Sequence, residues 1–490
     1  MTRLPGWVCG ILLAICLGKS APLVAVDHDL WSHYPNQNVV SSIAEGEDEI
    51  FFGTTGGIRR YHRFRDTWLR PITTADGLPD NQVDAMRFDP STGDLEIRTR
   101  TGTARWMTRI HALNLGGFTR LDPVRHVSRI PSVVPPFGYY INGNIVRGPH
   151  QNYGITDTLV DSWNILWIAT EGWGIGRADL KFNELTFIRS GPIVQNVTAI
   201  EIDESTVWVG GRDDYDVFAR GISRFDRETD EWVHFEQEAI QRLDDTQVND
   251  IVADSSDVWF ATDRGVVRYQ KQIEAWDTYR LNAGSGTRRL RRATSLARAG
   301  SRLWIGTERG LAVLDHQTDT IRAVGGSEIF RIRDLASGAQ YVWAATNKGL
   351  FRTSVDDVTW KEASTNPATR QPILALDVSG DTTWAFAALP PTLLVSTNPD
   401  SSWRTLSVPE AGSESTVSLS ASGERAWIGT NSGIIRISTE TGKLTTMTRI
   451  DGLLHDKVTG IRLEGPYVWV GSRKGLSRYR WLDDFNDPDD

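Results

Sequence analysis

Residues 258–279 read VWFATDRGVVRYQKQIEAWDTY, and variants of this stretch recur along nearly the whole chain. Most copies have a Trp, a small residue two positions later, and a polar turn that ends at Gly. Eight of these Trp residues, from Trp167 to Trp469, follow one another at intervals of 39 to 51 residues. A repeat of this length with Gly-containing turns predicts an all-β chain made of four-stranded β-propeller blades.

Ten copies of the repeat are recognisable, beginning at residues 51, 95, 166, 207, 258, 303, 342, 383, 426 and 468. In the copy quoted above, we expect four strands at residues 248–253, 258–262, 265–269 and 274–279. The segments between them carry the Asp, Ser and Gly residues that tight reversals require. The same pattern predicts about ten four-stranded blades for the whole chain.

Most of the 19 Trp residues fall at two positions of the repeat. We expect the second-strand indole to fill the wedge between neighbouring blades and the small residue after it to let the next blade approach. The second-strand residues are Trp167, Trp208, Trp259, Trp304, Trp343, Trp384, Trp427 and Trp469. The fourth-strand residues are Trp31, Trp68, Trp232, Trp276, Trp360 and Trp403. Trp7 belongs to the N-terminal leader, which leaves Trp106, Trp163, Trp173 and Trp481 without a place in the repeat.

The two ends of the chain are expected to meet in one blade. The last copy has three strand-like segments but no fourth, whereas the segment 29–35, with LWSHYP from Leu30, resembles a fourth strand alone. Joining the two removes two exposed sheet edges, so residues 29–35 are predicted to complete the last blade of one ring. The alternative is two smaller propellers, with the degenerate copies at Leu95 and Thr383 as candidate seams.

Stretches such as LWIGTERGLAVLD from Leu303 and AWIGTNSGIIRI from Ala426 resemble the two-component regulator propeller repeat. This family occurs in extracytoplasmic sensor domains of hybrid histidine kinases and in exported propellers. The resemblance implies a β-propeller that binds a ligand, and it is nearly silent about which ligand. No kinase or DNA-binding region follows the repeats in this sequence, which departs from the sensor kinases.

The N-terminus predicts export. Residues 1–20 contain an apolar run from Leu4 to Leu17 and are expected to be a signal peptide, although an uncleaved membrane anchor or lipid attachment at Cys16 is the alternative. Both cysteines lie in this leader. The propeller is then expected over residues 21–482, followed by a solvated acidic tail at 483–490. A periplasmic or secreted location follows from this interpretation.

Charge and motifs limit the functions to consider. The formal net charge of −9 becomes −11 when Arg3 and Lys19 leave with the signal peptide, so nucleic acid is not an expected partner. No apolar run after the leader is long enough to span a membrane. The nine His residues show no metal-ligand spacing, and no phosphate-binding loop or nucleophile motif is present, so we expect no metal, no cofactor and no catalytic residue.

Insertions at turns predict a binding face, because connections at one end of the blades diversify most freely. They occur at 107–156, at the turn with Trp173, at 211–221 and after Leu281. We expect aromatic and basic side chains from these insertions to form one neighbourhood for an anionic saccharide, a carboxylate-bearing peptide or an acidic protein surface. The candidate residues are His150, Tyr153, Trp173, Asp213, Asp214, Tyr215, Phe218, Arg288, Arg289, Arg291 and Arg292. The alternative is that the insertions are solvated loops over a wide channel.

The sequence therefore favours an exported, non-catalytic propeller that recognises a protein, peptide or glycan. A sensor that works through a separate envelope signalling partner remains open. The rival from another class is a propeller hydrolase or lyase acting on an envelope polysaccharide or peptide, because carboxylates from distant blades could converge in space.

Overall fold

The structure, a computed structural model, describes residues 30–481 apart from 117–120, 122–129, 150, 213–220, 237–239, 241–246, 282–289, 291, 317, 328–329, 399, 401 and 413–416. The expected signal peptide at 1–20 and acidic tail at 483–490 lie outside the described residues. Within the described part, no helix is long and apolar enough to cross a membrane.

The described chain forms ten antiparallel sheets; nine consist of strands that follow one another in sequence, and the tenth joins β1 to β40–β42. We call the first three, together, the three-blade unit. Their strands are β2 (Val40–Glu45), β3 (Glu49–Thr54), β4 (Gly57–His62) and β5 (Thr67–Ile72); β6 (Val83–Asp89), β7 (Asp94–Thr99), β8 (Thr103–Met107) and β9 (Ala112–Leu115); and β10 (Tyr140–Asn142), β11 (Ile145–Arg147), β12 (Asn152–Val160), β13 (Ile165–Thr170), β14 (Ile175–Asp179) and β15 (Leu185–Ile188).

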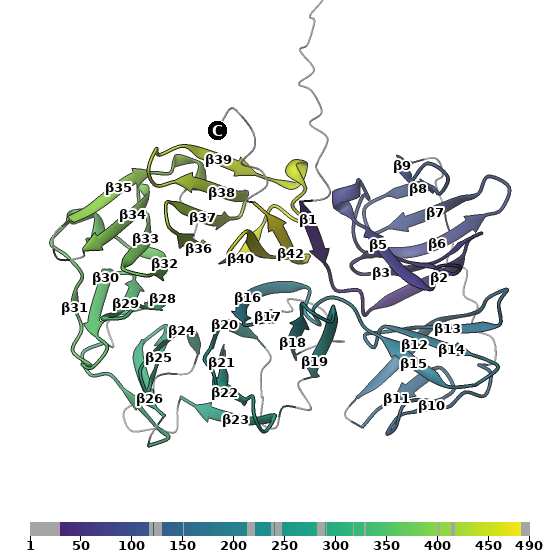
Figure 1. Ribbon diagram of the computed structural model, residues 1–490, viewed down its shortest axis with the longest axis horizontal. Coiled ribbons are helices and arrows are strands. Elements are labelled where there is room, and N and C mark those ends of the chain that lie inside the picture. The colour runs from purple at the N-terminus through teal and green to yellow at the C-terminus, as the bar shows by residue number, and fades with distance from the viewer. Residues whose placement is uncertain are drawn as a thin grey trace, which may run out of the picture.

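The other seven sheets form what we call the seven-blade ring (Figure 1). The first four are β16 (Asn196–Asp203), β17 (Thr206–Arg212), β18 (Gly221–Asp226) and β19 (Glu231–Glu236); β20 (Val248–Ala253), β21 (Asp257–Thr262), β22 (Gly265–Gln270) and β23 (Ala275–Arg280); β24 (Ala293–Ala299), β25 (Arg302–Thr307), β26 (Gly310–Asp315) and β27 (Thr320–Ala323); and β28 (Ile332–Ser337), β29 (Tyr341–Thr346), β30 (Gly349–Ser354) and β31 (Lys361–Glu362). The remaining three are β32 (Ile373–Ser379), β33 (Thr382–Ala388), β34 (Pro391–Asn398) and β35 (Ser402–Ser407); β36 (Ser418–Ser422), β37 (Arg425–Thr430), β38 (Gly433–Ser438) and β39 (Leu444–Met447); and β40 (Val458–Glu464), β41 (Tyr467–Ser472), β42 (Gly475–Arg480) and β1 (Trp31–Tyr34). Short 3-10 helices lie at η1 (Thr74–Asp76), η3 (Pro367–Arg370), η4 (Pro409–Ala411) and η5 (Arg449–Asp451).

The N-terminal segment completes the last sheet, as the sequence predicts. Strand β1 pairs with β42 in antiparallel register from Trp31 opposite Tyr479 to Tyr34 opposite Leu476. On the other side of this sheet, β40 and β41 pack against β16. The seven innermost strands β16, β20, β24, β28, β32, β36 and β40 therefore follow one another around the ring (Figure 1).

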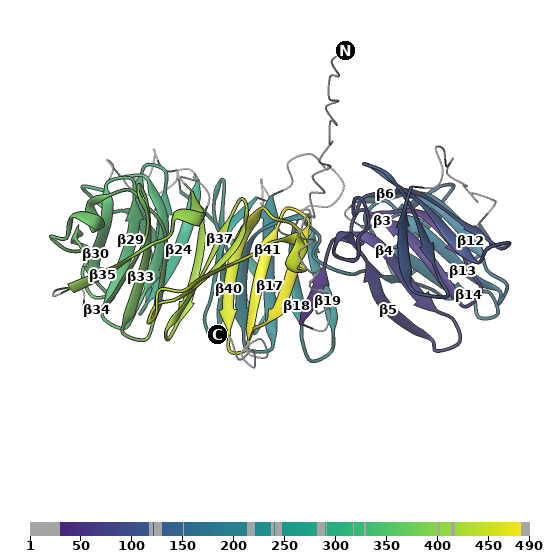
Figure 2. The same ribbon diagram turned by 90° about the horizontal axis from the view of Figure 1, so that it is seen from above.

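The expectation of a single ten-blade ring is wrong. Strand β16 has β20 on one side and β40 on the other, so no place remains for the first three sheets. The sheet of β2–β5 lies in the middle of these three: β2 contacts β12 and β13 on one side and β6 on the other. Figure 2 shows the three-blade unit beside the ring and not stacked on its faces.

Two substitutions in the repeat explain why the three-blade unit ends at β6–β9. In the ring, Gly306 lies so close to Ile332 of the next blade that an added Cβ would come within 2.6 Å of it. The equivalent stretch of β7 is LEIRT, with Glu96 in place of the Trp and Arg98 in place of the Gly. Glu96 pairs with Arg87 and Arg105 on its own sheet, at 2.5 and 3.2 Å. Burying these charges against another blade would cost free energy, which disfavours a further blade at this face.

The second-strand indoles lie buried between blades, as predicted. Trp208 packs in the core with Val248, Phe260 and Tyr269 of the next sheet, and Trp469 packs with Val197 and Phe225 of the first sheet of the ring. All eight are at most 2% exposed: Trp167, Trp208, Trp259, Trp304, Trp343, Trp384, Trp427 and Trp469. Each of these blade junctions therefore buries a large aromatic surface.

Part of the insertion at 107–156, residues 130–147, covers the free face of the sheet formed by β12–β15. Its hairpin β10–β11 turns at Gly143 and Asn144 and extends the sheet to six strands. Tyr139 stacks on Trp173 with ring centroids 4.0 Å apart, and Val146 is buried in the same cluster. We call residues 130–147 the cap. The two ends of the three-blade unit are thus finished differently, one by charge and one by the cap.

Two chain segments connect the three-blade unit to the ring and run side by side. The backbone N–H of Gln37 donates to Ser190 O at 3.1 Å, and Asn36 Nδ2 donates to Ile193 O at 2.8 Å. Tyr153 Oη also donates to Glu236 of β19 at 2.5 Å, and Glu236 pairs with Arg189 at 2.7 Å. Polar contacts therefore join the two parts of the molecule.

Candidate functional site

Charged side chains gather where the second strand of a blade ends and the first strand of the next begins. These two points lie at the same end of a blade because the strands are antiparallel: Val248 is opposite Thr262, and Ala293 is opposite Thr307. Asp263 follows Thr262, and Arg292 precedes Ala293. Residues far apart in sequence are thereby brought to one mouth of the ring.

Five of these side chains form a continuous set of ion pairs that we call the charged arc: Arg212, Asp263, Arg292, Glu308 and Arg331. Arg292 Nε lies 2.8 Å from Asp263 Oδ1, and Arg212 Nη2 lies 3.5 Å from the same oxygen. Glu308 Oε1 lies 3.1 Å from Arg331 Nη2 and 3.6 Å from Arg292 Nη1. The arc crosses four consecutive blades with three cations and two anions, all of them partly exposed.

Asn249, at the start of β20, holds the centre of the arc. Its Nδ2 donates to Asp263 Oδ1 at 2.9 Å and to Ala293 O at 2.7 Å. Its Oδ1 accepts from Arg212 Nε at 3.2 Å and from Arg292 Nη2 at 3.3 Å. One amide therefore fixes two guanidinium groups relative to each other, which preorganises them for an anion.

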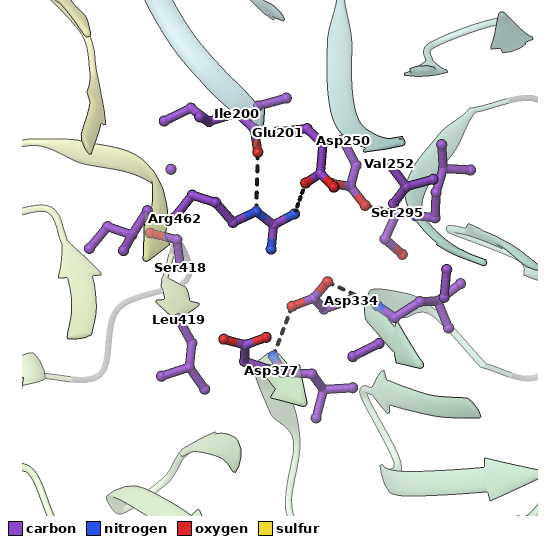
Figure 3. A pocket seen from close by; sticks show the side chains of 18 of the residues that line it. Ile200, Glu201, Asp250, Val252, Ser295, Asp334, Asp377, Ser418, Leu419 and Arg462 are labelled. Atoms are coloured by element: carbon purple, nitrogen blue, oxygen red, sulfur yellow. Dashed lines mark hydrogen bonds and ion pairs between the residues drawn. The ribbon is translucent and has the colours of Figure 1, made fainter. Parts of the chain in front are cut away.

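Beneath this mouth the inner strands enclose a central channel with a cavity of about 630 Å³ (Figure 3). Four carboxylates line it, on Glu201, Asp250, Asp334 and Asp377, together with the guanidinium of Arg462. Arg462 Nη2 pairs with Glu201 Oε2 at 2.9 Å, and Arg462 Nε donates to Ile200 O at 3.2 Å. The arginine of the last blade thus reaches the first blade of the ring across their junction.

The channel carboxylates connect neighbouring blades. Asp250 Oδ2 accepts from the backbone N–H of Leu296 at 2.7 Å, and Asp334 Oδ2 accepts from that of Leu376 at 2.8 Å. Asp377 Oδ2 accepts from the N–H of Ala421 at 2.6 Å in the same way. Each acid bridges the inner strand of its own blade to that of the next. These oxygens are therefore already engaged in holding the ring.

Enclosure by the blades changes the acidity of these groups. Burial raises the pKa of Glu201 and Asp250 to about 7 and that of Asp334 to about 6, although Arg462 partly offsets the effect. Burial also raises the pKa of Asp377. The negative charge of Glu201 raises the pKa of Arg462, which stays cationic. The channel keeps access to water, since 31% of the Arg462 side chain is exposed.

The structure places only part of the predicted neighbourhood. Arg292 lies in the charged arc. Trp173 and Tyr153 are 6% and 2% exposed, so the prediction that their side chains belong to an accessible ligand-binding neighbourhood is wrong. Trp173 is covered because Tyr139 of the cap and Phe187 stack on it, with ring centroids 4.0 and 3.9 Å away. His150, Asp213, Asp214, Tyr215, Phe218, Arg288, Arg289 and Arg291 lie outside the described residues.

Arg212, Asn249 and Arg331 were missed by sequence reasoning. Each is an ordinary polar residue at a strand end, and only the blade geometry brings them together. The sequence did offer one signal for this site: Asp263 and Glu308 each stand two positions before the turn Gly of their repeats. Among the described residues, no group of three or more His, Cys, Asp or Glu side chains is arranged to hold a metal ion.

Comparison with protein-family models finds no match, and neither does comparison with curated proteins. Among solved structures, the chain is similar to the extracellular domain of a protein described as a hybrid two-component system of B. thetaiotaomicron, at 15% identity over 90% of this chain and 70% of that one, with a TM-score of 0.47. It is similar to PorZ, a surface component of the type-IX secretion system of Porphyromonas gingivalis, at 13% identity over 90% and 68%, TM-score 0.47. It is also similar to virginiamycin B lyase from Staphylococcus aureus, at 12% identity over 58% and 94%, TM-score 0.47. At these values none of the three assigns a function, and membership of the two-component regulator propeller family stays a prediction.

Proposed function

We propose that this chain is an exported binding propeller that recognises an anionic group of a protein, peptide or glycan at the charged arc. The observation that carries the proposal is the arc itself: three guanidinium groups and two carboxylates are held across four blades of an otherwise acidic protein. Asn249 fixes two of the guanidinium groups before any ligand arrives. Bidentate binding of carboxylates or sulfates suits such a preorganised set of donors.

The hydrogen bonds and the ion pair of the channel acids favour binding over catalysis. Asp250, Asp334 and Asp377 each accept hydrogen bonds from the next blade, and Glu201 is paired with Arg462. A hydrolase needs one acid free to donate a proton and a second free to attack or to activate water. The rival prediction of a hydrolase or lyase therefore gains no support from these four residues.

The proposal is tested with two short labelled peptides, hexaglutamate and hexalysine, added to the chain without residues 1–20. We expect hexaglutamate to bind and hexalysine not to bind, with binding that weakens as salt is added. The double variant Arg292→Ser, Arg331→Ser should weaken hexaglutamate binding by about tenfold or more, since hydrogen bonds to charged groups contribute about 1.5–3 kcal/mol each.

A matched control is Arg322→Ser, which removes an exposed arginine from β27 at the outside of the same ring. It should leave binding unchanged. Equal loss in the control, or unchanged binding in the double variant with its melting temperature preserved, would rule out the arc as the site.

A further inference from the structure

Two exposed aromatic side chains of the three-blade unit meet where two turns from neighbouring blades come together. One turn connects a first to a second strand, and the other connects a third to a fourth strand. Trp163 lies in the turn between β12 and β13, and Phe64 lies in the turn between β4 and β5. Their exposed fractions are 48% and 64%. Their ring centroids are 4.8 Å apart, and the rings are nearly perpendicular at 85°. We call this pair the aromatic step.

The step is held rigidly from below by Arg63, which is buried. Arg63 Nη1 donates to Glu45 Oε1 at 2.7 Å and to Ser162 Oγ at 2.8 Å, and Nη2 donates to Gly46 O at 2.8 Å. Its guanidinium carbon lies 5.7 Å from the centroid of the Trp163 ring. Three turns from two blades are thereby tied together underneath one indole.

The backbone of Trp163 is fixed as well. Asp161 Oδ1 accepts from the N–H of Trp163 at 2.9 Å and from that of Ile165 at 3.0 Å, while Asp161 Oδ2 accepts from Trp167 Nε1 at 2.9 Å. An exposed indole that is immobilised in this way loses little conformational entropy when a ligand covers it.

We propose that the aromatic step binds a neutral saccharide, with a pyranose ring stacked on Trp163 and against Phe64. The apolar area is only two rings wide, far below the roughly 800 Å² per partner that a stable protein interface buries. Ser162 next to Trp163 is exposed and polar, and so are Glu47 and Asp48 on the β2–β3 turn that Arg63 ties to the step. A pyranose matches this pattern, because its C–H face is apolar and its hydroxyl groups lie around the edge.

This site is separate from the charged arc in place and in ligand chemistry. It lies on the three-blade unit, whereas every residue of the arc belongs to the seven-blade ring. Failure of one proposal therefore leaves the other standing.

The test uses 5-fluorotryptophan in the full chain and ¹⁹F NMR, with cellohexaose, chitohexaose and xylohexaose as probes. The Trp163 signal is identified as the one missing from the spectrum of Trp163→Phe. We expect at least one oligosaccharide to shift this signal in a saturable way. In Trp163→Ala, calorimetry should show affinity lowered by at least about tenfold, whereas Trp163→Phe should retain part of it.

The matched control is Phe182→Ala, which removes another exposed aromatic side chain from the same three-blade unit and should leave binding unchanged. Three outcomes would overturn the proposal. These are no shift of the Trp163 signal with any probe at millimolar concentration, equal loss in Phe182→Ala, and a shift caused by decaproline but by none of the oligosaccharides, which would assign the step to an extended peptide.

Discussion

The seven-blade ring and the three-blade unit are built from the same repeat but treat their blade faces in opposite ways. In the ring, every blade presents a Trp to the next blade and receives one from the blade before, so both faces are buried. The three-blade unit has two terminal faces and must finish each of them. Glu96 and Arg98 make one face polar, and the cap covers the other. One end of the unit therefore depends on two side chains of a second strand, and the other end depends on an inserted segment.

The surfaces of the two parts differ accordingly. Among the described residues, ten of the fourteen exposed large apolar side chains lie in the three-blade unit, although this unit is the smaller part of the chain. The seven-blade ring carries the other four, Val233, Ile273, Leu389 and Ile450. A closed ring hides its apolar surface between blades, while an open group of blades keeps more of it in contact with solvent.

The largest expected effect comes from opening the ring. Trp469→Ala removes a fully buried indole from the junction between the last and the first blade, and should lower the free energy of unfolding by about 3–5 kcal/mol. Urea denaturation followed by circular dichroism measures this change. Trp163→Ala is the control, because its exposed indole in the three-blade unit should cost less than about 1 kcal/mol. Equal costs for both variants would contradict the packing role of Trp469.

A smaller effect is expected from removing the cover of the open unit. Trp173→Ala takes away the ring on which Tyr139 of the cap stacks, at a cost of about 3 kcal/mol confined to the three-blade unit. Brief trypsin digestion should then cleave the cap at Arg147 faster than in the unaltered chain, while fragments of the ring keep their resistance. An unchanged cleavage pattern would show that the cap does not depend on this indole.

The sequence predicted the repeat, the strands, the buried indoles and the pairing of the N-terminal segment, because all of these are local patterns or direct consequences of them. The grouping of blades was missed, although Leu95 was named as a candidate seam and Glu96 and Arg98 stand beside it. The other candidate, Thr383, lies in a blade that packs on both sides. Trp173 was assigned wrongly because the insertion that covers it lies earlier in the sequence, and its path over the sheet leaves no periodic signal.

The smallest expected effect tests the acids that bridge the blades of the ring. Burial raises the pKa of Asp334 to about 6, from about 4 in an unfolded chain. The folded state therefore binds a proton more tightly than the unfolded state, so the stability that Asp334 contributes is complete below about pH 4 and is lost as the pH rises through about 6.

Asp334→Asn removes this titration while its amide oxygen can still accept from Leu376 N–H. The free energy of unfolding of the variant, relative to that of the unaltered protein, should therefore increase as the pH is raised from 4 to 7. In both proteins Glu201, Asp250 and Asp377 still lower the stability as the pH rises, because their pKa values are raised too. Thr294→Val supplies the control, because it removes an uncharged bridge to Ile332 O at 3.1 Å and its cost should not vary with pH. If the difference between Asp334→Asn and the unaltered protein is constant across this range in urea denaturation, Asp334 titrates alike in the folded and unfolded states. Such a result would show that enclosure by the ring does not desolvate the Asp334 carboxyl group.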